Sequence, residues 1–131
     1  MTRPLSRILY VDDEPTLQKV TRATLERLGG FTVAVAGSGP EALTMVGEFS
    51  PDLILLDVMM PGMDGPATLQ ALRARSACAD IPVVFITAKA QGQEIARFLD
   101  LGVVGVVTKP FDPRALPDIL RQLWAKRKPA P

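Results

Sequence analysis

The chain has 131 residues, a net charge of +1, 47% apolar residues and one cysteine, Cys78. A chain of this length buries a core without disulfides or a structural metal, and one cysteine excludes an internal disulfide and a thiolate metal site. The absence of histidine excludes Ser-His-Asp and Cys-His catalysis, histidine-ligated zinc and an internal phosphohistidine. The near-neutral charge gives no reason to expect nucleic-acid or membrane binding, and no apolar run approaches the ~20 residues of a membrane span.

Five short segments are predicted to be strands. They are apolar throughout rather than alternating, which is typical of parallel strands that are buried on both faces. In chain order these segments are residues 8–11, 33–35, 53–56, 83–86 and 103–107.

The segments between the strands carry helix signals. Over residues 15–28 the apolar residues form one helical stripe, which consists of Leu17, Val20, Thr24, Leu25 and Leu28. Ser38 and Glu41 have capping-box spacing before a second helix that ends near Phe49. Further helices are predicted over residues 66–75 and 91–101, and from Asp112-Pro113 to Trp124. Five successive βα units predict an α/β fold with a doubly wound parallel sheet.

A single domain is expected over residues 1–131, with a core from about residue 7 to residue 125. The short basic and proline-containing tail over residues 126–131, together with Ala125, is expected to be a frayed, solvated end. Residues 1–7 lead into the first strand without the apolar stretch of a signal peptide. We therefore expect a cytoplasmic protein.

Polar residues follow four of the five predicted strands at the point where each strand ends. Asp12 and Asp13 come after the first strand, Asp57 after the third, Thr87 after the fourth and Lys109 after the fifth. Ligands of open α/β sheets bind outside the carboxyl ends of the strands, near the point where the strand order reverses. We therefore expect these side chains to form one site.

The three carboxylates of such a site repel one another, and a pair ~4 Å apart costs about 4 kcal/mol at an effective dielectric near 20. Lys109 offsets part of this repulsion. An all-oxygen site favours a hard divalent cation, above all Mg²⁺ where water and phosphate complete the octahedron. With that ion in place, an acidic site accepts a phosphoryl group, and Asp57 is a candidate nucleophile that forms an aspartyl phosphate.

These residues resemble the pattern of the receiver domains of two-component response regulators. The match consists of Asp12-Asp13, residues 55–65 around Asp57, Thr87-Ala88 and Lys109-Pro110-Phe111, and it spans about residues 8–124. The resemblance implies the flavodoxin-like strand order 2-1-3-4-5 and a cis peptide bond before Pro110. It also implies a phosphorylatable signalling switch and not an enzyme with external substrates, since a receiver catalyses only its own Mg²⁺-dependent phosphorylation and dephosphorylation.

The resemblance assigns roles to the acidic residues. Asp57 is the expected phosphoacceptor. Mg²⁺ is expected to be bound directly by Asp13, by Asp57 and by the backbone carbonyl of Met59, and through water by Asp12.

The resemblance also assigns roles to the residues around the acids. Lys109 is expected to pair with Asp57 and, after transfer, with the phosphoryl oxygens. The Thr87 hydroxyl is expected to move toward the phosphoryl group with its loop, and the small Ala88 leaves the acid accessible. Val106 departs from the family pattern, which has an aromatic residue three positions before the lysine. Because valine has little to rotate, we expect the output to come from the loop after Thr87 and the fourth helix.

By the same resemblance, a stand-alone receiver takes its phosphoryl group from the phosphohistidine of a sensor histidine kinase or a histidine phosphotransfer protein. It then signals by binding an unknown downstream protein or by onward phosphotransfer. Docking is expected through the first helix near Leu17, Gln18 and Thr21 and through Pro110-Phe111. No nucleic-acid or membrane partner is expected, and the chain is expected to be a monomer or a weak dimer.

Three alternatives compete with this interpretation. A phosphatase that resembles the haloacid-dehalogenase family needs a second aspartate two residues after the nucleophile, where this chain has Met59. A flavodoxin-like FMN binder has hydroxyl-rich and glycine-rich residues after its first strand, where this chain has Asp12-Asp13-Glu14. A receiver-shaped interaction module that takes no phosphate remains open because of Val106.

Overall fold

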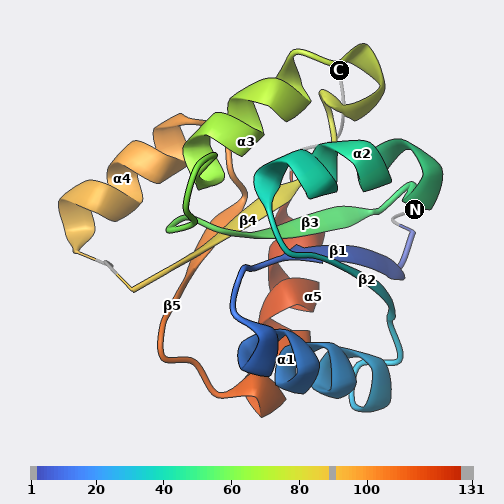
Figure 1. Cartoon of the computed structure of the whole chain (residues 1–131). Helices are drawn as coiled ribbons and strands as arrows, with labels where there is room; N and C mark the ends of the chain where they lie inside the picture. Colours follow the sequence, from blue (N-terminus) through green and yellow to red (C-terminus); the bar gives the residue numbers. More distant parts are fainter. Residues whose placement is uncertain (1–2, 89–90, 128–131) are drawn as a thin grey trace.

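The protein folds around one parallel sheet. A computed structural model describes residues 3–88 and 91–127 of the chain. Within these residues the five strands lie in the order β2-β1-β3-β4-β5, and each neighbouring pair is parallel. This arrangement confirms the predicted doubly wound α/β fold (Figure 1). The strands are β1 Arg7–Val11, β2 Thr32–Ala36, β3 Leu53–Asp57, β4 Val83–Thr87 and β5 Gly105–Thr108.

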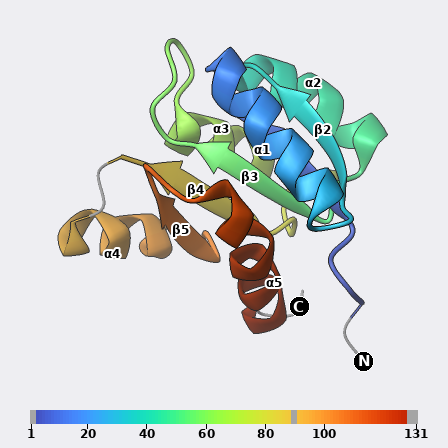
Figure 2. The same cartoon turned by 90° about the horizontal axis from the view of Figure 1, so that it is seen from below.

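Helices cover both faces of this sheet. Figures 1 and 2 show α1 and α5 on one face and α2 and α3 on the other. The α-helices are α1 Pro15–Arg27, α2 Gly39–Phe49, α3 Gly65–Arg73, α4 Gly92–Asp100 and α5 Leu116–Lys126. Two 3₁₀ turns, η1 Ser76–Cys78 and η2 Pro113–Ala115, precede β4 and α5.

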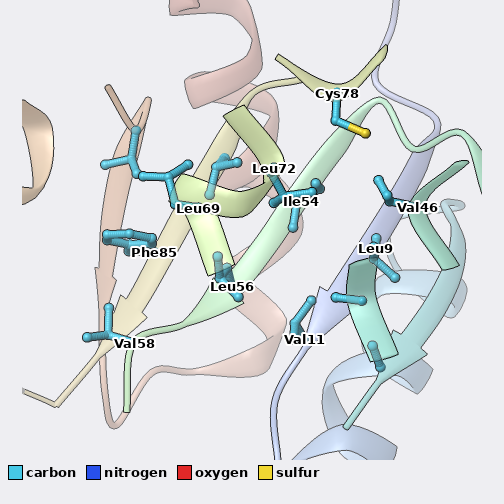
Figure 3. Packing of buried hydrophobic residues seen from close by; sticks show 14 of the residues in the cluster. Leu9, Val11, Val46, Ile54, Leu56, Val58, Leu69, Leu72, Cys78 and Phe85 are labelled. Carbon is cyan, nitrogen blue, oxygen red and sulfur yellow. The ribbon is translucent and has the colours of Figure 1, made fainter. Parts of the chain in front are cut away.

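One hydrophobic core lies between the sheet and helices α2, α3 and α4. Figure 3 shows side chains from the strands, such as Leu9 and Ile54, lying among the side chains of Val46 and Leu72 from the helices. The ring of Phe85 on β4 meets Phe98 on α4 edge to face, with ring centroids 5.2 Å apart. Every residue of β3 and β4 is buried, which explains why these strands are apolar without alternation.

A second core lies on the opposite face, between the sheet, α1 and α5. Tyr10 and Leu55 from the strands pack there with Leu25 of α1 and Leu120 of α5. Trp124 closes this core at the end of α5, and its indole Nε1 donates a hydrogen bond to the backbone oxygen of Arg3 at 2.7 Å. The two cores pack against both faces of the sheet. The polar residues therefore lie at the edge where the carboxyl ends of the strands meet.

The apolar stripe predicted on α1 is only partly buried. Leu25 is fully buried, whereas Val20 is 46% exposed and Leu28 is 61% exposed. Thr21, which the periodicity did not single out, is fully buried beside Leu25. The stripe therefore identified the helix, but the buried face is rotated away from Val20 and Leu28.

Two helix starts are capped by side chains, and the cap at Ser38 is the predicted one. The Ser38 hydroxyl accepts a hydrogen bond from the Glu41 N–H at 3.2 Å, and the Asp64 carboxylate accepts one from the Ala67 N–H at 2.9 Å. The start of the last helix differs from the prediction. Asp112 caps the short turn η2 by accepting a hydrogen bond from the Arg114 N–H at 3.0 Å, and α5 begins directly after this turn at Leu116.

The end of the chain also differs from the sequence prediction. Ala125 and Lys126 belong to α5, and the guanidinium of Arg127 lies 3.4 Å from the ring centroid of Trp124. The expectation of a frayed end is wrong for these residues because the cation–π contact and the helix hold them. The rest of the predicted tail, residues 128–131, lies outside the described residues. In the part of the chain that the structure describes, no helix is both long and apolar enough to span a bilayer.

Candidate functional site

The ends of four strands bring the predicted site residues to one edge of the sheet. Asp12 and Asp13 follow β1 directly, Asp57 is the last residue of β3, and Thr87 is the last residue of β4. Lys109 follows β5, and its backbone N–H donates a hydrogen bond to the Thr87 carbonyl at 2.8 Å. All five residues therefore lie at the carboxyl ends of parallel strands, as the sequence predicted.

The three acids converge at this edge. One carboxylate oxygen from each of Asp12, Asp13 and Asp57 lies within 4.8 Å of the others. Asp12 is completely buried and Asp57 is 2% exposed, whereas Asp13 lies at the surface. This spacing matches the donor set of a hard divalent cation, which binds carboxylate oxygens from several side chains at once.

Asp12 is tightly fixed by hydrogen bonds. Its Oδ1 accepts from the Glu14 N–H at 2.9 Å, and its Oδ2 accepts from the Tyr10 hydroxyl at 2.8 Å. The side-chain amide of Gln18 donates to the Asp12 carbonyl. The residue thus has both its carboxylate and its backbone held in place.

Lys109 is the cation of the site. Its Nζ lies 3.2 Å from Asp57 Oδ2 and 3.4 Å from Asp12 Oδ2. Burial opposes the charge of this lysine, but the carboxylates of Asp57 and Asp12 outweigh it and raise the pKa of Lys109. The ammonium group therefore stays charged between the two buried acids.

Asp57 carries a charge that its surroundings disfavour. Burial raises the pKa of the Asp57 carboxyl, and the Asp12 carboxylate raises it further. Lys109 and the Met59 N–H, which lies 3.4 Å from Asp57 Oδ1, act in the opposite direction without cancelling the rise. A second cation at this site relieves the same repulsion, so the electrostatics of the described residues fit a bound divalent ion.

The backbone around Asp57 is shaped by the turn that follows β3. Gly62 has a φ of +75°, which favours glycine. A Cβ at Gly65 would lie 2.8 Å from the Asp57 carbonyl oxygen, so the start of α3 needs glycine to pack against the end of β3. The Lys109-Pro110 peptide bond is cis, as the resemblance implied.

Comparison with known proteins identifies the family. Residues 8–121 match the model of the response regulator receiver domain. The chain belongs to the response regulator receiver family. Its members are phosphorylatable signalling switches of two-component systems, and this receiver domain is such a switch and not a classical enzyme.

Two curated relatives show how far the similarity extends. The receiver is 44% identical over 110 residues to the DNA-binding response regulator MtrA of Mycolicibacterium smegmatis, which covers 84% of this chain and 46% of MtrA. It is 37% identical over 128 residues to the response regulator Rre1 of Synechocystis, which covers 98% of this chain and 55% of Rre1. The chain thus spans about half the length of the curated relatives it matches.

Solved structures share the fold. The chemotaxis protein CheY4 of Vibrio cholerae superposes with a TM-score of 0.83 and 28% identity, over 91% of this chain and 98% of CheY4. The receiver domain of a signal transduction histidine kinase from Syntrophus aciditrophicus superposes with a TM-score of 0.78 and 31% identity, over 95% and 96% of the two chains.

The receiver domain departs from the family pattern at Val106. This residue is half-buried on β5 and packs against the core that contains Phe85 and Phe98. The loop after Thr87, which is expected to carry the output, begins at the exposed residue Ala88, and its residues 89–90 lie outside the described residues. The expected output route stays a prediction.

The predicted docking residues fall into two groups. Leu17, Pro110 and Phe111 line a shallow pocket of about 340 Å³ together with Glu14 and Lys109. Thr21 is fully buried, so the expectation that it contacts a partner is wrong. Its position on α1 faces the second core because the buried face of the helix is rotated relative to the predicted stripe.

Sequence reasoning did not identify Tyr10 as part of the site. This tyrosine lies two residues before Asp12, and residues i and i+2 of a strand point to the same face. The spacing between Tyr10 and Asp12 could have indicated this contact, but a single aromatic residue within an apolar strand is typical of a core residue. The structure places its hydroxyl on the Asp12 carboxylate.

Proposed function

We propose that Asp57 is the phosphoacceptor of this receiver, and that it takes the phosphoryl group from the phosphohistidine of a sensor histidine kinase or a histidine phosphotransfer protein. The observation that carries this proposal is the convergence of three carboxylates within 4.8 Å around a single lysine that lies 3.2 Å from Asp57. A buried acid in such surroundings needs a counterion to react with an anionic donor.

Mg²⁺ is the ion that these residues fit best. Asp13, Asp57 and the backbone carbonyl of Met59 would hold it directly, and Asp12 would hold it through water. Three acids against one lysine leave an excess of negative charge within the cluster, and an all-oxygen donor set favours a hard cation. When bound, the ion neutralises the charge that develops on the transferring phosphoryl oxygens.

The transfer itself requires few changes in the protein. A carboxylate oxygen of Asp57 forms the new P–O bond while the P–N bond to the donor imidazole breaks and the imidazole leaves with its electron pair. Lys109 pairs with the Asp57 carboxylate before the transfer and with the phosphoryl oxygens after it. The Thr87 hydroxyl moves toward the phosphoryl group, and the exposed Ala88 leaves the approach open.

The reaction stops at the aspartyl phosphate, apart from its slow hydrolysis by the receiver itself. An aspartate phosphatase needs an acid two residues after its nucleophile, and this receiver has Met59 there. Lys109 pairs with both Asp57 and Asp12, so neither Lys109 nor Asp12 is free to protonate the leaving group of an external substrate. The receiver therefore modifies itself and does not turn over other molecules.

Residues 1–131 act as one receiver unit, and phosphorylation shifts its equilibrium between two conformations. The altered state is read by a downstream protein or by onward phosphotransfer, through Thr87, its loop and α4. The receiver acts in the cytoplasm, as a monomer or a weak dimer, and makes no contact with nucleic acid or membrane itself, in keeping with its net charge of +1.

The test is incubation with acetyl phosphate and Mg²⁺, read by intact mass, and with the phosphoryl mimic beryllofluoride and Mg²⁺, read by NMR. The wild-type chain is expected to gain one phosphoryl group, and Asp57→Asn to gain none. Asp100→Asn, which removes an exposed acid of α4 outside the cluster, serves as the matched control and is expected to react like the wild type. A wild-type chain that stays unmodified would favour the interaction module that takes no phosphate.

A further inference from the structure

We propose that Tyr10 is a positioning residue of the acidic site, which fixes the Asp12 carboxylate and thereby keeps Lys109 available to Asp57. This inference rests on the proposed function, because it concerns the same metal and phosphoryl site. Among the described residues, Tyr10 makes no hydrogen bond to Asp57 or to the other residues proposed to bind the ion directly. It acts through Asp12.

The contact between Tyr10 and Asp12 is short and shielded from water. The hydroxyl lies 2.8 Å from Asp12 Oδ2, and both residues are completely buried. A hydrogen bond from a hydroxyl to a carboxylate is shorter and stronger than one between neutral groups, and a buried pair has no water to replace a lost partner.

The hydroxyl acts as a donor in this contact. Burial raises the pKa of Tyr10 far above its usual value, and the carboxylates of Asp12 and Asp57 add to the rise. The Asp12 carboxylate can only accept, so the Tyr10 hydroxyl donates the hydrogen bond between them. Its ring packs in the second core, between β1 and the helices α1 and α5, so the hydroxyl has a fixed position.

The same Asp12 oxygen is also the one that faces Lys109. Nζ lies 3.4 Å from Asp12 Oδ2 and 3.2 Å from Asp57 Oδ2, so the ammonium group is shared between the two acids. The Tyr10 hydroxyl satisfies Oδ2 at a shorter distance than the lysine does. Without it, Asp12 rotates more freely and draws Lys109 away from Asp57.

Tyr10→Phe removes the hydroxyl and keeps the ring. We expect it to weaken Mg²⁺ binding to the unphosphorylated receiver about tenfold, as is typical when an outer partner of a metal site is lost, because Asp12 must then be ordered when the ion binds. Phosphorylation by acetyl phosphate at saturating Mg²⁺ is expected to slow about tenfold as well, because Lys109 is shared less favourably.

Titration calorimetry with Mg²⁺ in a double-mutant cycle separates this role from a purely structural one. If Tyr10 acts through Asp12, Tyr10→Phe has no further effect on the Mg²⁺ affinity of the Asp12→Asn chain. Thr68→Val, which removes another fully buried hydroxyl whose hydrogen bond goes to the Asp64 carbonyl, is the matched control and is expected to leave Mg²⁺ affinity unchanged. Circular dichroism checks that each variant is folded.

A measurement on chains that retain the tyrosine covers the case in which Tyr10→Phe fails to fold. Tyr10 is the only tyrosine of the sequence, so ¹³Cζ-labelled tyrosine gives a single resonance. This resonance is expected to shift on Mg²⁺ addition and on Asp12→Asn, and to stay in place on Asp100→Asn.

The outcomes distinguish this inference from the proposed function. Unchanged or tighter Mg²⁺ binding by Tyr10→Phe, an equal loss in the wild-type and Asp12→Asn backgrounds, or a Tyr10 resonance that ignores both Mg²⁺ and Asp12→Asn would overturn the role of Tyr10 alone. A wild-type chain that binds no Mg²⁺ would overturn the proposed metal site, and the role of Tyr10 with it.

Discussion

Replacing Asp57 with asparagine is expected to stabilise the protein when no divalent ion is present. Asp12 and Asp57 have oxygens within 4.8 Å of each other, so their repulsion is at least about 3.5 kcal/mol at an effective dielectric near 20. The attraction between Lys109 and Asp57, which lie 3.2 Å apart, contributes about 5 kcal/mol at the same dielectric. The attraction exceeds this lower bound on the repulsion by less than about 2 kcal/mol, so the burial of Asp57 decides the sign.

Burial raises the pKa of Asp57 in the folded protein above its value in the unfolded chain. For an acid with a raised pKa, the favourable contribution is present at low pH and is lost as the pH rises through the folded-state pKa. The charged carboxylate therefore destabilises the fold at pH 7. Asp57→Asn removes this charge and leaves Lys109 paired with Asp12, and we expect a gain of about 1 kcal/mol, or about 4 °C in melting temperature.

Thermal unfolding by circular dichroism measures this difference with EDTA and with Mg²⁺. In EDTA, Asp57→Asn is expected to melt above the wild type at pH 7 and to lose this advantage as the pH falls below the pKa of the unfolded aspartate. Mg²⁺ at a hundred times its Kd stabilises the wild type by about 2.7 kcal/mol and stabilises Asp57→Asn much less. A variant that melts at or below the wild type in EDTA at pH 7 would refute this reasoning.

Lys109→Met is expected to slow phosphorylation by acetyl phosphate at least tenfold and to destabilise the fold by about 2 kcal/mol, because two buried acids lose their cation; an unchanged rate by intact mass, measured beside Lys126→Met, would contradict the role of the lysine. Gly65→Ala is expected to cost about 2 kcal/mol in urea unfolding because its Cβ meets backbone at 2.8 Å, whereas Gly47→Ala, with open space around its Cβ, gains up to about 1 kcal/mol; equal effects would argue against the close packing of α3 on β3. Phe85→Ala is expected to cost about 4 kcal/mol, since its ring is fully buried against Phe98, and a loss below about 1 kcal/mol by the same method would contradict that packing.

The strand ends and their acids could be predicted from the sequence because both signals are local. A strand that is apolar up to its last residue, such as Leu53–Asp57, indicates burial on both faces, and the polar residue that ends it then lies at the edge of the sheet. The order of the strands is different in kind. It came from the resemblance to the receiver family, because no local pattern states which strand lies beside which.

The features that the sequence did not predict depend on how side chains pack in three dimensions, which a residue pattern does not specify. The exposure of Val20 and Leu28 on α1 follows from how the helix is rotated on the sheet, which a stripe of apolar residues does not specify. The cation–π contact of Arg127 with Trp124 extends α5 into residues that read as a tail. The ring of Tyr10 packs in the second core, and this position brings its hydroxyl to the Asp12 carboxylate.

Peptide mapping by mass spectrometry tests most directly whether Asp57 is the acceptor. The wild-type chain is treated with acetyl phosphate in Mg²⁺ or in EDTA, and the acyl phosphate is trapped by reduction before digestion. We expect the modification on the peptide that contains Asp57, in Mg²⁺ and not in EDTA. Modification at another residue, or equal modification in EDTA, would contradict the central claim.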